Sequence, residues 1–175
     1  VRFAPNKAYE GKTVAAIAAL RGQSEAQTLL YIIAAADSFR QRHPDASGVA
    51  TIMGKSMSDD DVAKLLLWEG TNVCSDGGDG GHPRGYGSFT RVLDRYVKQQ
   101  RIMSWETAIH KMTGQAAEHT GIRNRGLLAP GYFADMVLID PATVKDNASI
   151  EHSKALSDGI SMVWVNGVLV YQDKQ

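Results

Sequence analysis

In the first half of the chain, short apolar runs alternate with amphipathic segments, which predicts strands and helices in turn. Apolar residues at helical spacing predict a helix from Val14 that stops at Gly22. A second helix opens on Ser24, with Gln27 completing a capping box, and the apolar run 49–53 predicts a short strand. We expect this second helix to turn an apolar stripe toward the core: Leu29, Ile32, Ile33 and Ala36.

Ser58 and the three aspartates after it predict the start of a third helix, since helix N-termini favour anions. A cation site is the alternative reading of this acidic run. The apolar stretch 71–76 is interpreted as a strand, with Cys74 buried within it. Two further helices are predicted, one around 89–97 and one after Ser104, and their core-facing residues are Val62, Leu65, Leu66, Phe89, Val92, Leu93, Tyr96, Val97, Trp105, Ala108, Ile109 and Met112.

From residue 126 the pattern becomes that of an all-β segment. Residues 132–140 predict a strand with a buried centre, and 162–171 predict two strands joined at Asn166-Gly167, a strong hairpin signal. The fold class is therefore α/β, with strand–helix alternation to about residue 121 followed by strands.

Composition narrows the partners of this 175-residue chain. Nineteen basic residues balance nineteen acidic ones, which argues against a nucleic-acid or anionic-membrane partner. The single cysteine excludes an internal disulfide and a multi-cysteine zinc site. No apolar run has the roughly 20 residues of a membrane span, and the first residues do not resemble a secretory signal. We expect a cytoplasmic location.

The loop 75–89 holds the best candidates for chemistry. Asp76 follows the predicted strand and is a candidate general base or metal ligand. His82 and Arg84 follow in the same glycine-rich loop, and a guanidinium can grip a carboxylate through two hydrogen bonds. A phosphate loop is disfavoured because the GxxxxGK[ST] pattern is absent and two aspartates would repel phosphate. A purely structural turn stays open.

The histidines offer no metal site of their own, because none of the five forms a pair at ligand spacing. Glu106 and His110 lie one helical turn apart and are interpreted as a surface pair, and His119 as a cap or surface residue.

Several segments together resemble the C-terminal part of the metal-dependent amidohydrolase superfamily, and most closely its N-acyl-D-amino-acid deacylase (D-aminoacylase) branch. The segment GYFADMVLID is typical of the whole superfamily, and SDG followed by HPRGYGSFTRVL is more specific to the deacylases. The resemblance covers nearly all of the chain but corresponds to about the last third of a family member.

The resemblance implies a fold and a set of roles. Residues 1–125 would form the C-terminal segment of a (β/α)8 barrel with the active-site loop 75–89, and 126–175 the strands of the small flanking β-sandwich. Asp76 matches the family's proton-transfer aspartate, which deprotonates the metal-bound water and protonates the leaving amine. Arg84 matches the arginine that holds the substrate's α-carboxylate, with His82 beside it as a further substrate-binding residue.

The family's zinc ligands lie in an N-terminal part that has no counterpart here, so we expect no metal ligands in this chain and no activity from it in isolation. Unpaired barrel strands invite pairing with another chain, so we expect self-association or docking on the missing barrel half. The expected substrate is an N-acyl-D-amino acid. The alternatives are another amidohydrolase, such as a cyclic amide hydrolase or deaminase, and a non-catalytic interaction module.

Overall fold

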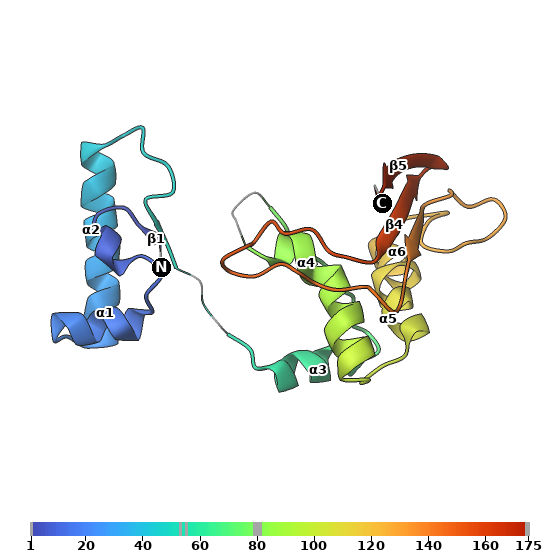
Figure 1. The fold of residues 1–175 in the computed structure, drawn as a ribbon, viewed down its shortest axis with the longest axis horizontal. Helices are drawn as coiled ribbons and strands as arrows, with labels where there is room; N and C mark the ends of the chain where they lie inside the picture. Colours follow the sequence, from blue (N-terminus) through green and yellow to red (C-terminus); the bar gives the residue numbers. More distant parts are fainter. Residues whose placement is uncertain (1, 53, 55, 79–81, 174–175) are drawn as a thin grey trace. The chain divides into compact units, whose positions relative to one another are not determined.

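The computed structural model describes residues 2–52, 54, 56–78 and 82–173. The chain folds as two compact units, residues 1–56 and residues 57–175 (Figure 1). Each unit is described by itself below. The predicted division into a barrel segment, 1–125, and sandwich strands, 126–175, refers to the fold of a complete family member and stays a prediction.

The first unit is a helical hairpin closed by a two-stranded ribbon. Strand β1 (Arg2–Phe3) is followed by the short helix η1 (Lys7–Tyr9) and by helices α1 (Val14–Arg21) and α2 (Glu25–Arg42). Strand β2 (Ala50–Thr51) comes last and pairs antiparallel with β1. Both predicted helices and the capping box are confirmed: Gly22 ends α1 in a left-handed conformation, and Ser24 and Gln27 bond reciprocally. Met53 of the predicted strand 49–53 lies outside the described residues.

The apolar stripe predicted for α2 is only half correct. Ile32 and Ala36 are buried against Phe3, Ile17 and Val49, whereas Leu29 and Ile33 are 39% and 57% exposed. The reason is that α1 and the ribbon cover one side of α2, and no other described element of this unit covers the flank that carries Leu29 and Ile33.

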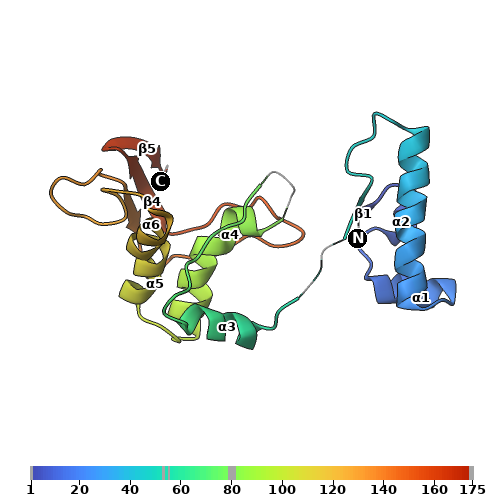
Figure 2. The same cartoon turned by 180° about the vertical axis from the view of Figure 1, so that it is seen from behind.

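The second unit is built on four helical segments, which lie together in both views (Figures 1 and 2). They are α3 (Asp59–Leu67), α4 (Arg84–Arg91), α5 (Trp105–Met112) and α6 (Gly114–Thr120), and α4 continues without a break into the π-helical turns of η2 (Val92–Gln99). Helices α3, η2 and α5 share a core with Val144 of the loop after β3, and its buried residues are Leu66, Val92, Leu93, Tyr96, Val97, Ala108 and Val144. The predicted starts at Ser58 and Ser104 are confirmed by side-chain caps, but Leu65, Phe89 and Ile109 are exposed because they lie beside the buried stripe of their helices.

The strand predicted over 71–76 is wrong: residues 71–78 run without regular secondary structure. A strand needs a hydrogen-bonded partner, and no strand among the described residues pairs with this stretch. For the same reason Cys74 is exposed rather than buried.

The C-terminal part is a three-stranded antiparallel sheet in the order β3 (Met136–Ile139), β4 (Ile160–Val165), β5 (Val168–Gln172). The predicted hairpin is confirmed, with Asn166 and Gly167 both at positive φ (53° and 79°), as its tight turn requires. The centre of β3 is not buried as predicted, since Val137 and Leu138 are about half exposed. Every residue of β5 is exposed as well, so the sheet has largely uncovered faces.

Among the described residues, no helix combines the length and the apolar character that a membrane crossing requires.

Candidate active-site loop

Asp76 occupies a tight bend in the loop between α3 and α4. Its φ of 44° is in the left-handed region, which aspartate tolerates better than most residues other than glycine. The next residue, Gly77, lies close to the returning arm of the loop: a Cβ added there would be 3.0 Å from the Cα of Gly85. The bend and this close approach bring the start of α4 beside Asp76.

Arg84, the first residue of α4, contacts Asp76 twice. Its Nε donates to the main-chain carbonyl of Asp76 at 2.9 Å, and its Nη2 lies 2.9 Å from the Oδ2 carboxylate oxygen. The Arg84 and Asp76 side chains are 48% and 73% exposed, so solvent and solutes reach both groups. The two residues predicted to carry the chemistry are therefore in direct contact.

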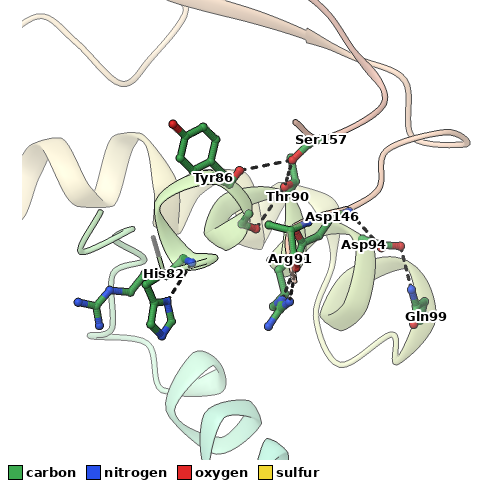
Figure 3. Close-up of polar contacts among 11 residues, drawn as sticks. His82, Tyr86, Thr90, Arg91, Asp94, Gln99, Asp146 and Ser157 are labelled. Atoms are coloured by element: carbon green, nitrogen blue, oxygen red, sulfur yellow. Dashed lines mark hydrogen bonds and ion pairs between the residues drawn. The ribbon is translucent and has the colours of Figure 1, made fainter. Parts of the chain in front are cut away.

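His82 acts within the loop as a local cap. Its Nδ1 accepts a hydrogen bond from the main-chain N–H of Arg84 at 3.1 Å, which Figure 3 draws as the dashed line at His82. A ring nitrogen that accepts from an amide carries no proton. His82 thus orients the start of α4, and residues 79–81, with Asp79 among them, lie outside the described residues.

A second loop, residues 146–157, holds α4 and η2 from the other side (Figure 3). Asp146 pairs with Arg91 at 2.6 Å, and its main-chain N–H points at the carboxylate of Asp94 at 3.4 Å. The hydroxyls of Ser157 and Thr90 are 2.6 Å apart. The sequence analysis missed these contacts because no local pattern links residues that lie more than 50 positions apart.

Buried Asp94 connects this loop to the helix. Burial acts to raise the pKa of Asp94, but hydrogen bonds from Gln99 and Lys98 and from the main chain of Asp146 outweigh it, so the pKa lies below its ordinary value. The Gln99 amide donates at 2.9 Å, and the Lys98 ammonium lies at 3.3 Å. The Asp94 carboxylate is thereby kept anionic, with its hydrogen bonds satisfied, on η2, which continues the helix that begins at Arg84.

The described residues do not fit a zinc ion, because they contain no group of three or more histidine, cysteine or carboxylate side chains that could bind one. Cys74 is two residues from Asp76 but stands as a single exposed thiol. An open cavity of about 370 Å³ lies elsewhere in this unit, along α5 and α6, with His110, Arg123 and Arg125 in its lining. The described residues of the loop can therefore supply a carboxylate and a guanidinium.

The comparison that decides the family is a match to the amidohydrolase family model over residues 4–171. The chain belongs to the amidohydrolase family. Among curated relatives, it is 47% identical over 122 residues to the N-acyl-D-aspartate deacylase of Alcaligenes xylosoxydans xylosoxydans, which covers 68% of this chain and 24% of that protein.

Solved amidohydrolase structures resemble this chain over almost its entire length. A crystal structure of D-aminoacylase superposes with a TM-score of 0.79 at 35% identity, covering 98% of this chain and 34% of that one. The N-acyl-D-glutamate deacylase of Bordetella bronchiseptica, solved with zinc and a phosphonate inhibitor, gives a TM-score of 0.77 at 34% identity, covering 98% and 34%. This amidohydrolase chain thus spans about a third or less of the relatives it matches.

Proposed function

We propose that this amidohydrolase chain is the C-terminal portion of a zinc-dependent enzyme that hydrolyses N-acyl-D-amino acids to a carboxylate and a free D-amino acid. The similarity to N-acyl-D-aspartate and N-acyl-D-glutamate deacylases supports the substrate class. The observation that carries the proposal within the chain is the direct contact between Asp76 and Arg84. Residues 1–125 would then complete a (β/α)8 barrel and 126–175 a β-sandwich, as the resemblance implies, and the cytoplasmic location stays a prediction.

In the proposed reaction Asp76 transfers protons and Arg84 binds the substrate. The Asp76 carboxylate takes a proton from the attacking water and delivers it to the leaving amine, which is the role of a general base that then acts as an acid. Arg84 binds the α-carboxylate through its planar guanidinium, and His82 holds the main chain of Arg84 in place. Zinc would be held by residues of the whole enzyme outside this chain.

The ion pair between Asp76 and Arg84 is compatible with these roles because it is exposed. Solvent-exposed ion pairs contribute about 1 kcal/mol or less, so a substrate carboxylate can displace Asp76 from Arg84 at small cost. Binding of substrate would then release the Asp76 carboxylate for proton transfer.

A chimera tests this proposal. The part of the Alcaligenes N-acyl-D-aspartate deacylase that precedes the counterpart of this chain would be joined to the chain. The chimera would be assayed for amine release from N-acyl-D-aspartate and N-acyl-D-glutamate, and for ring opening of a cyclic imide. We expect hydrolysis of an N-acyl-D-amino acid by the chimera and none by the isolated chain. Turnover of the imide alone would instead favour a cyclic amide hydrolase.

Within an active chimera, Asp76→Asn is expected to lower kcat by about 10²-fold or more, because it removes the proton-transfer group. Arg84→Met is expected to raise KM instead. Asp60→Asn, at an exposed aspartate of α3, is the matched control and should retain full activity. Full activity of Asp76→Asn would contradict the role of this carboxylate.

We also infer that the isolated chain self-associates through its uncovered sheet. All five residues of β5 are exposed, and four of them are apolar or aromatic: Val168, Leu169, Val170 and Tyr171. Because an open apolar edge strand pairs readily with another chain, this edge would bind a second copy when the remainder of the enzyme is absent.

A further inference from the structure

Lys111 is a buried cation with an unusual set of partners. It belongs to α5, is 3% exposed, and directs its ammonium at three main-chain carbonyls: Trp68 at 2.6 Å, Thr71 at 3.1 Å and Glu69 at 3.3 Å. Gln115 of α6, 8% exposed, donates from Nε2 to two of the same carbonyls, Glu69 at 2.6 Å and Thr71 at 3.2 Å. Two buried side chains from neighbouring helices thus serve one short stretch of backbone.

The chemistry of this contact explains why a lysine is stable there. A buried ammonium needs an acceptor for each of its three N–H bonds, and the three carbonyls supply them. Trp68 is the C-cap of α3, where unpaired carbonyls and the helix dipole favour a cation. The contact therefore fixes both the end of α3 and the start of the segment that follows.

That segment leads directly to Asp76. Residues 71–78 have no regular structure, and no strand among the described residues pairs with them. Thr71 Oγ1 and Asn72 Oδ1 are buried with no hydrogen-bond partner in the part of the chain that the structure describes, so these side chains do not anchor the segment. Its start is held by Lys111 and Gln115, and its far end by the contacts of Arg84 with Asp76.

We infer that Lys111, assisted by Gln115, is a positioning residue that fixes the backbone from Thr71 to Asp76 and so sets the place of the Asp76 carboxylate. The helix pair α5–α6 takes no direct part in the chemistry of the loop but determines where its acidic residue lies. This inference rests on the proposed function only for what Asp76 does; the positioning itself is independent of it.

The native thiol allows a direct test in the 175-residue chain. Cys74 is the single cysteine, is exposed, and lies between Thr71 and Asp76, so a nitroxide attached to it reports the mobility of this segment. In Lys111→Met we expect a more mobile spin-label spectrum, because the charge-assisted hydrogen bonds that hold the start of this segment are lost.

Lys98→Met is the matched control. Lys98 is partly buried, with its side chain 32% exposed, and it also donates to a main-chain carbonyl, that of Val144, which lies in a different segment. We expect it to lower the melting temperature without changing the spectrum of the label on Cys74. An unchanged label in folded Lys111→Met, or an equal change in Lys98→Met, would overturn the inference.

Gln115→Met provides a second test in case the Lys111→Met variant does not fold. It leaves the ammonium in place and removes the second donor, so a smaller increase in label mobility is expected, and no increase would contradict the inference. In the active chimera, Lys111→Met should lower kcat with little change in KM, and should add nothing to Asp76→Asn. If Asp76→Asn stays fully active, the proposed function fails while the label result still decides the positioning role.

Discussion

At the scale of single residues, Gly87 shows how closely α4 and the loop 146–157 fit together. A Cβ added at Gly87 would lie 2.1 Å from Oδ1 of Asp146 and 2.7 Å from its Cγ. The carboxylate cannot move away freely, because it pairs with Arg91 and accepts a hydrogen bond from the N–H of Ala148. Only glycine fits at position 87 as long as Asp146 keeps its contacts with Arg91 and Ala148.

We therefore predict that Gly87→Ala destabilises the chain by about 1–3 kcal/mol, the usual cost of forcing an extra carbon into a packed site. Urea unfolding followed by circular dichroism measures this. Gly70→Ala is the control, since its added Cβ would make ordinary 3.7 Å contacts with the Trp68 ring. Adding Asp146→Ala to Gly87→Ala should cost less than the sum of the two changes; additive costs would argue against the clash.

Asp94 leads to a prediction about pH. Its pKa is lowered in the folded chain, so it stabilises the fold above the pKa of the unfolded state, ~3.9, and this contribution is lost as pH falls through the lowered folded value. Asp94→Asn should be less stable than the wild type near neutral pH and should lose less stability on acidification. Urea midpoints from pH 7 down to pH ~3 measure this difference.

Asp173→Asn, at an exposed carboxylate, serves as the control and should follow the wild-type acid profile. Other carboxyls with lowered pKa values, including those of Asp61, Asp135 and Asp140, also contribute to acid sensitivity, so the profile of Asp94→Asn should be flatter but not flat. Identical pH slopes for wild type and Asp94→Asn would show that the carboxylate is not held as described.

At the scale of elements, the helices were predictable, but the irregular course of residues 71–76 before Asp76 was not. Helix starts depend on contacts three residues apart, such as Ser24 with Gln27 and Ser104 with Thr107, and the sequence displays those pairs directly. The hairpin at Asn166-Gly167 was predictable for the same reason. Whether residues 71–76 form a strand depends on a partner strand, which no local pattern can supply.

The motif resemblance named three candidate residues, whose roles stay a prediction, but the contacts that support their loop could not be predicted. The motif resemblance singled out Asp76, His82 and Arg84, and the structure brings these three together in one loop. The supports, Lys111 beneath Thr71 and Asp146 beside Arg91, lie 40 and 55 residues from their partners. Such contacts follow from tertiary packing, which neither periodicity nor residue spacing encodes.

At the scale of the whole molecule, the uncovered sheet is the feature with the largest consequence for behaviour in solution. Val168→Lys combined with Val170→Lys places two charges on the open strand β5, at positions that are 63% and 59% exposed. Because charged edge strands resist pairing, we predict that this variant shifts the sedimentation profile of the isolated chain toward monomer.

Leu128→Lys provides the comparison, since Leu128 is 78% exposed but lies in a loop rather than on the sheet. This variant should sediment like the wild type. A wild-type chain that is monomeric at every concentration tested would contradict self-association outright. Equal shifts in the Leu128 and β5 variants would indicate non-specific hydrophobic association rather than pairing at the sheet edge.

The left-handed bend at residue 76 has a consequence for how this gene can change over generations. Glycine adopts that backbone shape more easily than aspartate does, so selection for foldability alone favours replacing the acid. Copies released from the need to catalyse should therefore accumulate glycine at this codon, one base change away, and lose the carboxylate while keeping the turn. If Asp76 transfers protons as proposed, an intact acid at this position distinguishes a catalytic lineage from one that has lost its activity.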